Sequence, residues 1–194
     1  MQITRPDLIV LTPLFVLFVL KFSFKYREME IMIEIGNNWG KIIEILHKGK
    51  KSNRFFSIAT VDDQGNPHVT PIGHVFFRDD STGYYFDAFS KAMPKNFETN
   101  KRICLMAVNS STLYWLKSLF LGSFQTSPAV RVFGEVSEPR EATEEEISRL
   151  KESIKITSRL KGHELLWSDL TRVRDMKFTS FSPATYPEMC EGLW

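Results

Sequence analysis

The sequence is poor in the residues that define several special classes of protein. Its 194 residues include only two cysteines, Cys104 and Cys190, which lie far apart and so exclude a disulfide framework and a cysteine zinc site. The formal net charge is only +2 and the basic residues form no long stripe, which argues against duplex nucleic acid as the main partner. Apolar runs are scarce apart from residues 8–20, so a multi-pass membrane protein is excluded.

Motifs of the common nucleotide-binding and hydrolytic sites are absent too. There is no glycine-rich dinucleotide fingerprint, no P-loop, no HExxH and no GxSxG. The four histidines show no tight ligand spacing. His68 and His74 are six residues apart and would share one face of a strand, so a metal pair there is the alternative to our prediction of no metal site.

What the chain does contain is the composition of an ordinary globular protein with many aromatic residues. It is 43% hydrophobic and 25% charged, which is too apolar for a disordered chain. Aromatic residues make up 13% of the sequence, and 16 of them are phenylalanines. This length suits one domain with a substantial core, or at most two small domains.

The apolar stretch at residues 8–20 reads LIVLTPLFVLFVL and contains Pro13. As a helix it would rise only about 20 Å, short of a hydrocarbon core of about 30 Å. No small-residue cleavage site follows it, which argues against a signal peptide. Three readings remain. The stretch is an extension that arises because translation is taken to start too early, with Met29 and Met32 as other possible starts; or it is a membrane anchor; or it is a buried element of the fold. The flanking positive charges, which would keep the main domain cytoplasmic, are Lys21, Lys25 and Arg27.

We therefore divide the chain into an extension, residues 1–31, and a domain, residues 32–194, which we expect in the cytoplasm. Periodicity and turn signals predict strands at residues 55–61, 67–77, 84–89, 103–108, 129–136 and 176–181. Helices are predicted at about residues 37–48, 90–101 and 143–160, with residues 113–121 as a short helix or a covering loop. Two prolines and Gly73 indicate that residues 67–77 are not a regular strand throughout. Six or so strands with few helices predict a small, mainly β barrel with peripheral helices.

Residues 90–96 combine groups that suit a phosphate. Ser90, Lys91, Lys95 and Asn96 bring hydroxyl, ammonium and amide groups to the start of a predicted helix, where backbone N–H groups are also free. Together these groups favour an anion. The alternative is a solvated first turn with its lysines at the surface.

Three segments, in order along the chain, carry a family resemblance. They read FFSIATVDDQGNPHVTPIGHVFF from residue 55, YYFDAFSKAMPKNFETNKRICLMAV from residue 84 and AVRVFGEV from residue 129. In this order they resemble the pyridoxamine 5′-phosphate oxidase-like, FMN-binding split-barrel family, over roughly residues 39–136. The most specific parts are ATVDDQGNPHVTPIG and the run S-K…K-N…T-N-K-R-I, which is similar to the family's Ser-Arg/Lys-Lys…Asn-Pro-Arg-Val.

The resemblance implies a six-stranded antiparallel split β-barrel of Greek-key type, which forms a homodimer with FMN at the subunit interface. The phosphate of FMN would be held by Ser90 and Lys91, with Lys95 nearby. Residues 70–74 would offer backbone groups to the isoalloxazine ring, and Asp87 and Ala88 would flank the ribityl chain. The predicted cofactor-binding residues are Thr70, Pro71, Ile72, Gly73, His74, Asp87, Ala88, Ser90, Lys91, Lys95, Asn96 and Trp115.

Two of these roles have alternatives. Trp115 and Trp167 are both candidates for covering the flavin ring, and the alternative for each is a place in the core. Asn96 is either a ligand contact or a helix residue that packs inward.

The chain also departs from true pyridoxamine-phosphate oxidases. It ends in TYPEMCEGLW where those enzymes carry an Arg-x-His-x-Arg-like substrate cluster, and Ala129 stands in place of a flavin-contacting glutamine. An extra residue in SKAMPKN leaves open which lysine reaches the phosphate. These departures argue against oxidation of vitamin B6 phosphates.

The resemblance therefore implies an FMN-dependent oxidoreductase that passes hydride or electrons between a reduced donor and a small substrate. No residue is an evident general acid or base, and no catalytic residue is predicted, because the cofactor carries the electron transfer. Two alternatives stay open. One is a flavin-binding or flavin-carrying protein without a dedicated substrate, and the other is the same barrel binding a deazaflavin or haem, with His74 as the residue to consider for haem.

Overall fold

The structure is a computed structural model that describes residues 32–88, 90–167, 170–186 and 188–194. These residues belong to the second of two units into which the chain divides, Met32–Trp194. The apolar stretch at residues 8–20, and with it the predicted extension, lies outside the described residues. Within the described part of the chain, no helix is long and apolar enough to cross a membrane.

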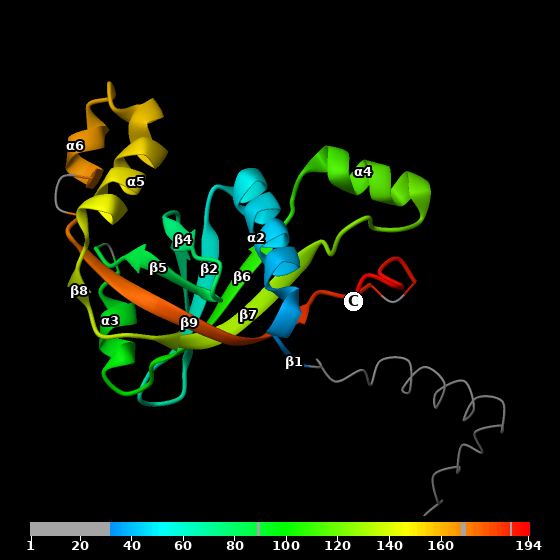
Figure 1. Cartoon of the computed structure of the whole chain (residues 1–194), viewed down its shortest axis with the longest axis horizontal. Helices are drawn as coiled ribbons and strands as arrows, with labels where there is room; N and C mark the ends of the chain where they lie inside the picture. Colours follow the sequence, from blue (N-terminus) through cyan, green and yellow to red (C-terminus); the bar gives the residue numbers. More distant parts are fainter. Residues whose placement is uncertain (1–31, 89, 168–169, 187) are drawn as a thin grey trace, which may run out of the picture. The chain divides into compact units, whose positions relative to one another are not determined.

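Strands form the centre of the domain and helices lie around them (Figure 1). The nine strands of the described residues are β1 (Ile33–Glu34), β2 (Phe56–Val61), β3 (Pro67–Ile72), β4 (Val75–Phe77), β5 (Thr82–Phe86), β6 (Arg102–Val108), β7 (Ala129–Val136), β8 (Arg140–Glu141) and β9 (Arg172–Pro183). The helices are η1 (Gly36–Asn38), α2 (Trp39–Asn53), α3 (Ala92–Phe97), α4 (Thr112–Leu121), α5 (Glu144–Ile154), η2 (Lys155–Thr157) and α6 (Gly162–Trp167).

All the strands belong to one antiparallel sheet, which runs in the order β3-β2-β6-β7-β9-β5-β4. The short strands β1 and β8 pair with β9. The two ends of this order, β3 and β4, follow one another in the chain with only Gly73 and His74 between them. The sheet therefore curls until its two edges meet at one bend, which makes it a split barrel and confirms the predicted fold class.

The predicted number of strands is too low. Six strands have five residues or more, as expected, but the sheet has nine because β1, β4 and β8 are added. Strands of two or three residues are too short to show a periodic pattern of their own, so β1 and β8 were not predicted, while β4 lies within the strand predicted at residues 67–77.

Residues 67–77 were predicted as one strand, and the structure divides them into β3 and β4 at Gly73 and His74. The two halves pair with different neighbours, β2 and β5. Both prolines, Pro67 and Pro71, lie in β3, which is a terminal strand of the sheet. Proline is tolerated there because a terminal strand has hydrogen-bonded neighbours on one side only, so its missing N–H disrupts less of the sheet than in a central strand. The irregularity expected from the prolines and Gly73 is thus confirmed as a change of partner.

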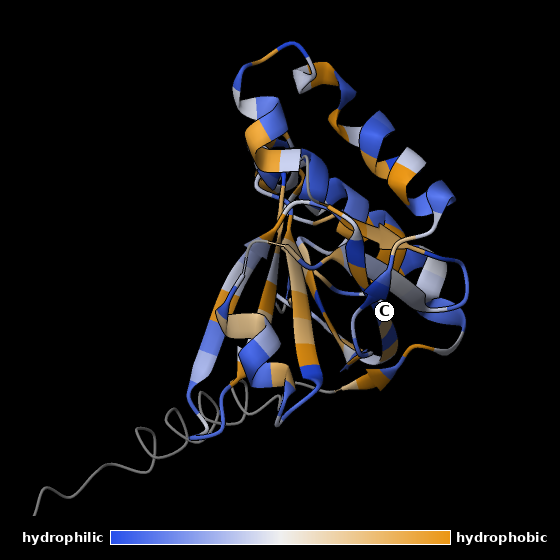
Figure 2. Cartoon of the chain, turned by 90° about the vertical axis from the view of Figure 1, so that its left-hand side faces the viewer, coloured by the Kyte–Doolittle hydropathy of each residue, from blue (hydrophilic) through white to orange (hydrophobic). Residues whose placement is uncertain are grey.

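The helix predicted from Asn37 or Asn38 to Lys48 is present as α2, and it continues to Asn53, where Arg54 ends it with a left-handed φ of 70°. Its buried face, which closes the barrel, consists of Trp39, Ile42, Ile45, Leu46 and Gly49. The helix lies so close to β6 that a Cβ at Gly49 would be 2.8 Å from the Cβ of Ala107. Figure 2 shows apolar residues alternating with polar ones along helices and strands, as burial of one face requires.

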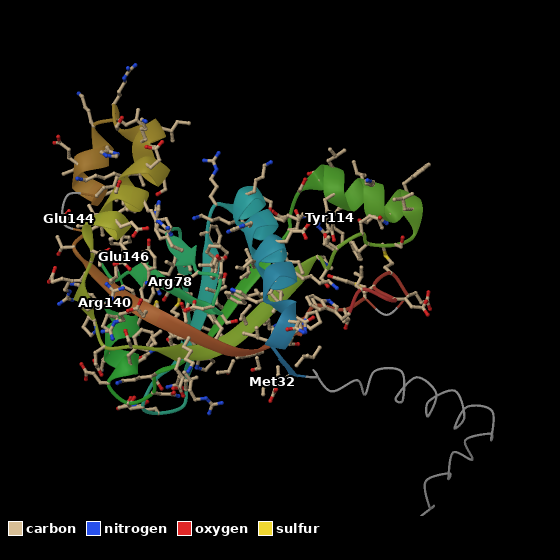
Figure 3. The ribbon with its side chains drawn as sticks, in the orientation of Figure 1. Met32, Arg78, Tyr114, Arg140, Glu144 and Glu146 are labelled. Carbon is tan, nitrogen blue, oxygen red and sulfur yellow. The ribbon has the colours of Figure 1, made fainter. Side chains whose placement is uncertain are left out.

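Helix α5 begins as the sequence predicts, because Thr143 and Glu146 form a capping box. The helix ends at Ile154, earlier than the predicted 160, and a separate helix, α6, follows. Two arginines fix α5 on the barrel: Arg140 and Arg78 both donate to the Glu146 carboxylate, at 2.7 and 3.0 Å, and both donate to Asp175 of β9 (Figure 3). Hydrogen bonds from Arg140 hold the pKa values of the Glu146 and Asp175 carboxyls below their usual range.

Candidate functional site

A pocket lies where the two edges of the sheet meet. Its volume is about 450 Å³, within the range of small-molecule sites, about 300–1,000 Å³. Four segments form it: β3 with the bend that follows, the end of β5, the turn into α3, and α6 with the residues after it. The lining residues are His68, Val69, Thr70, Pro71, Ile72, Gly73, His74, Tyr85, Phe86, Asp87, Ala88, Ser90, Lys91, Ala92, Trp167 and Leu170.

The longest wall of the pocket is a strand edge, made of seven consecutive residues from His68 to His74. Strand β3 pairs with β2 on one side, and no second strand among the described residues pairs with its other side. Every second residue of such a strand turns its backbone groups away from the ladder. The main chain of β3 can therefore hydrogen-bond a bound molecule.

Ser90 and Lys91 stand together at the turn into α3. The hydroxyl Oγ of Ser90 accepts the backbone N–H of Met93 at 3.1 Å, which leaves the hydroxyl proton free to be donated. The Lys91 side chain is exposed, and no carboxylate of the described residues pairs with it. A hydroxyl donor and an unpaired ammonium group in adjacent positions suit an anionic group such as a phosphate.

Asp87 lines the pocket, but its carboxylate is already occupied. Arg174 of β9 donates from Nε to Oδ2 of Asp87 at 2.6 Å, and both side chains are buried. Arg174 also donates to the backbone carbonyl of Ser137 and lies over the ring of Phe97. The pair is neutral overall, so the pocket lacks a free negative charge from Asp87 that would repel an anion.

His74 and Trp167 form an aromatic contact at the bend. Their ring centroids are 4.6 Å apart and their planes cross at 78°, an edge-to-face arrangement. Burial, and then the nearby positive charge of Lys50, lower the pKa of His74 from 6.5 to about 4. At neutral pH the imidazole is therefore uncharged, and the bend presents a largely apolar surface.

Two buried hydroxyls on residues that line the pocket have no hydrogen-bond partner within the described structure, Thr70 Oγ1 and Tyr85 Oη. Unpaired buried polar atoms are costly and rare, and a bound molecule is one way to satisfy them. Burial raises the pKa of Tyr85, so its hydroxyl keeps its proton. The pocket thus combines the polar groups of Ser90 and Lys91 with an apolar, aromatic wall.

The structure brings nine of the twelve predicted residues into this pocket and leaves three outside it. Lys95 and Asn96 lie further along α3, and the buried Asn96 donates from Nδ2 to the hydroxyl of Thr60 at 2.9 Å, so it packs inward. Trp115 belongs to α4 and donates from Nε1 to the carbonyl of Asn109 at 2.7 Å. Of the two tryptophans considered as ring covers, Trp167 is the one that lines the pocket.

Sequence reasoning missed several lining residues, namely His68, Val69, Tyr85, Phe86, Ala92 and Leu170. The first four immediately precede predicted residues on the same strands, so extending each predicted segment by two residues would have found them. Leu170 has no signal of this kind, because α6 and its return to the barrel were not predicted. Across residues 32–88, 90–167, 170–186 and 188–194, no group of three His, Cys, Asp or Glu side chains could hold a metal.

Comparison with models of protein families shows which family this chain belongs to. The family model described as pyridoxamine 5′-phosphate oxidase matches residues 44–177, more than half of the sequence. The chain belongs to the pyridoxamine 5′-phosphate oxidase family. The matched region contains β2 to β7, both sides of the bend and the turn into α3, and hence most of the pocket. A search of curated proteins found no match.

This chain is similar to several solved structures. An FMN-binding protein from Syntrophomonas wolfei subsp. wolfei is 12% identical, with 89% of this chain and 98% of that chain covered and a TM-score of 0.54. HupZ of Group A Streptococcus is 17% identical, over 74% and 98% of the two chains, with a TM-score of 0.47. The haem storage protein HutZ from Vibrio cholerae is 16% identical, over 75% and 92%, with a TM-score of 0.45. The likeness to the Syntrophomonas wolfei protein, at 12% identity, shows the fold alone.

Proposed function

We propose that this member of the pyridoxamine 5′-phosphate oxidase family binds FMN in the pocket beside β3 and acts as an oxidoreductase on a small molecule. The observation that carries the proposal is the pocket itself, which gathers residues from β3, the bend, β5 and the turn into α3. Its charge pattern supports an anionic flavin, because Lys91 is unpaired and the carboxylate of Asp87 is neutralised by Arg174.

Each part of the pocket has a distinct task in this proposal. Ser90 would donate its hydroxyl proton to the phosphate, and Lys91 would add a charge-assisted hydrogen bond. The unpaired edge of β3 would present main-chain groups to the polar rim of the ring, in a plane set by the pairing of β3 with β2. His74 and Trp167 would shield one end of the ring from water.

Bound FMN supplies the capacity to accept and release a hydride or single electrons. The protein's part is then to orient the cofactor and to set the electrostatics around it. Among the described residues that line the pocket, Asp87 has the only carboxylate and is paired with Arg174, and His74 is uncharged at neutral pH, so we assign no general acid or base.

Oxidation of a vitamin B6 phosphate is not part of the proposal. The C-terminal residues, which would have to carry a substrate cluster, pack near α4: the ring of Tyr186 meets that of Trp115 at 5.9 Å, and Trp194 donates to Ser127 at 2.6 Å. None of them lines the pocket. In this proposal the substrate is recognised by residues other than a C-terminal cluster.

The test is the absorption spectrum of the purified chain, together with the mass of any small molecule released on denaturation. We expect flavin bands and the mass of FMN, from the isolated protein or after adding FMN. A colourless protein that ignores added FMN would overturn the proposal, while a Soret band or a deazaflavin mass would assign the pocket to those ligands. Reduction of the bound flavin by NADH or NADPH, followed by turnover with an acceptor, would separate an enzyme from a flavin carrier.

A further inference from the structure

Helix α4 exposes a row of large apolar side chains. Leu113, Leu116 and Phe120 follow one another at spacings of three and four residues, so they form a stripe along one side of the helix. Phe120 is 90% exposed and Leu113 is 78% exposed, and the exposed Leu119 and Leu121 flank the stripe. We call these five residues the α4 face. Single exposed apolar residues are common, but contiguous groups of this size mark interaction sites.

The inner side of α4 holds the helix firmly on the domain. Tyr114 donates to the carbonyl of Thr126 at 2.6 Å. Trp115 donates to the carbonyl of Asn109 at 2.7 Å, and Ser118 is buried. These contacts fix which side of the helix faces outward before any partner arrives, so binding through the α4 face costs little ordering of the chain.

Lysine side chains stand beside the α4 face. A hollow of about 490 Å³ lies between α2 and α4, and its lining includes Lys48 and Lys51 of α2 and Lys117 of α4. Lys48 is paired with Glu44 at 2.6 Å. Within the described part of the chain no carboxylate pairs with Lys51 or Lys117. Because Lys117 is three residues from Phe120 on the same helix, positive charge borders the apolar stripe directly.

The segments that contain α4 and the second half of α2 have no acidic residue. Neither Asp nor Glu occurs in residues 45–61 or in residues 99–134. Together these two ranges hold eight basic residues and none of the 23 acidic ones, although the net charge of the whole chain is only +2. The C-terminal segment, which does contain glutamates, packs through Tyr186 on Trp115 at the inner side of α4. The outer surface around the α4 face is therefore positive as well as apolar.

We infer that the α4 face binds the surface of a bilayer that contains anionic phospholipids. A helix in the plane of such a surface places its leucines and phenylalanine among the acyl chains and the neighbouring lysines among the phosphates. Helix α4 has ten residues and is about 15 Å long, which suits this position and is too short to span a bilayer. In Figure 1, α4 stands away from the sheet at the edge of the domain. Packing of one α4 face on another would instead bring like charges together.

The first test places a fluorescent label on the helix itself, because the apolar residues 8–20 of the full-length chain also suit a membrane. Phe120→Cys carrying a nitrobenzoxadiazole label should shift its emission to the blue when vesicles of equal parts phosphatidylcholine and phosphatidylglycerol are added. Pure phosphatidylcholine should give a smaller shift. The same label on Ile156→Cys is the matched control, because Ile156 is 94% exposed and lies outside the α4 face, and its emission should stay unchanged. Cys104 and Cys190, which are half-buried and buried, contribute equally to both proteins.

The second test measures the charge. Each lysine near an anionic surface strengthens binding about fivefold, so Lys51→Gln combined with Lys117→Gln should weaken cosedimentation with the same vesicles about 25-fold. Lys151→Gln combined with Lys161→Gln removes the same charge from exposed positions elsewhere and should have a much smaller effect.

Substitution of the apolar stripe completes the design. Phe120→Glu should weaken vesicle binding about tenfold, because it removes an inserted apolar group and adds a repelled charge, whereas Ile156→Glu should bind like the native chain. The inference is wrong if the label at residue 120 does not shift, or if the two Glu variants lose affinity equally. It is also wrong if Phe120→Glu turns a native oligomer into a monomer in sedimentation velocity, because another copy then covers the α4 face. Circular dichroism checks that each variant keeps the fold, and none of these measurements needs FMN, so their outcome is independent of the proposed function.

Discussion

Lys91 and Lys95 are one helical turn apart and lie in different surroundings. Lys91 lines the pocket beside Ser90, whereas Lys95 lies further along α3, outside it. We expect Lys91→Ala to weaken FMN binding about tenfold, the lower end of the range for a charge-assisted hydrogen bond, because the side chain is exposed. Titration of the apoprotein with FMN, followed by flavin fluorescence, measures the effect.

Lys95→Ala is the matched control for this substitution. It removes the same charge from the same helix, so a general effect of net charge would appear in both variants. We expect its FMN affinity to stay close to that of the native chain. Equal weakening in the two variants would show that no single lysine holds the phosphate.

His74 makes the stability of the domain depend on pH. Burial, and then the positive charge of Lys50, lower its pKa from 6.5 to about 4, so between these values the unfolded chain binds a proton that the folded chain does not. Stability therefore rises with pH across this window. The contribution of His74 is fully present above pH 6.5 and is lost as the pH falls toward 4.

Urea unfolding at pH 7 and pH 5 measures this dependence, and NMR titration of the imidazole gives the pKa directly. The native chain should lose more stability on acidification than His74→Gln, which has no titrating group at this position. An imidazole that titrates near 6.5 in the folded protein would contradict the prediction.

At the scale of single residues, the sequence predicted the polar end of the pocket better than its apolar end. Ser90 and Lys91 could be placed because their chemical groups sit at the start of a predicted helix, and residues 70–74 were placed by the family resemblance. The state of Asp87 could not be predicted, since its partner Arg174 is distant in sequence and is brought close by the pairing of β5 with β9.

At the scale of elements, the long strands could be predicted and their partners could not. Alternation placed residues 55–61, 103–108 and 129–136 close to the observed β2, β6 and β7. Strand β9 is twice as long as the predicted 176–181, because it pairs with β1, β5, β7 and β8, and this pairing extends it beyond its apolar core segment. The pattern of residues within one segment gives no information about pairing with strands that are distant in the sequence.

Among the helices, too, those with local sequence signals could be predicted and the one without such signals could not. The start of α5 could be predicted at residue 143 because its signals are local in the sequence, and α4 could be expected from its apolar run. Helix α6 has only six residues and no strong start signal, so the helix was missed, and Leu170 with it, although Trp167 had been named as a candidate for covering the flavin ring. The missed helix therefore adjoins the candidate site.

At the scale of the whole domain, the order of motifs along the chain predicted the split barrel, and the family match supports the same conclusion. The sequence did not show how the barrel closes, since closure depends on one segment splitting between two edges. Nor did it show that α4 turns its leucines outward, because a run such as LYWLKSLFL is compatible with either orientation. Both features come from packing between distant parts of the chain.

The two prolines of β3 have a consequence for the protein in solution. An unpaired strand edge is a template on which another chain can add a strand and begin to aggregate, and proline is one protection because it has no N–H to donate. Pro67 and Pro71 alternate with Val69 along β3, so two of these three positions can accept a hydrogen bond but cannot give one. The edge can thus hold a ligand and still resist a foreign strand.

Pro71→Val would restore a donor in the middle of this edge. We expect the variant to aggregate faster than the native chain during incubation without ligand, as measured by light scattering at equal concentration. Added FMN should slow the aggregation, because a ligand seated along β3 would occupy the same backbone groups. Equal scattering from the two proteins would mean that something other than proline protects the edge.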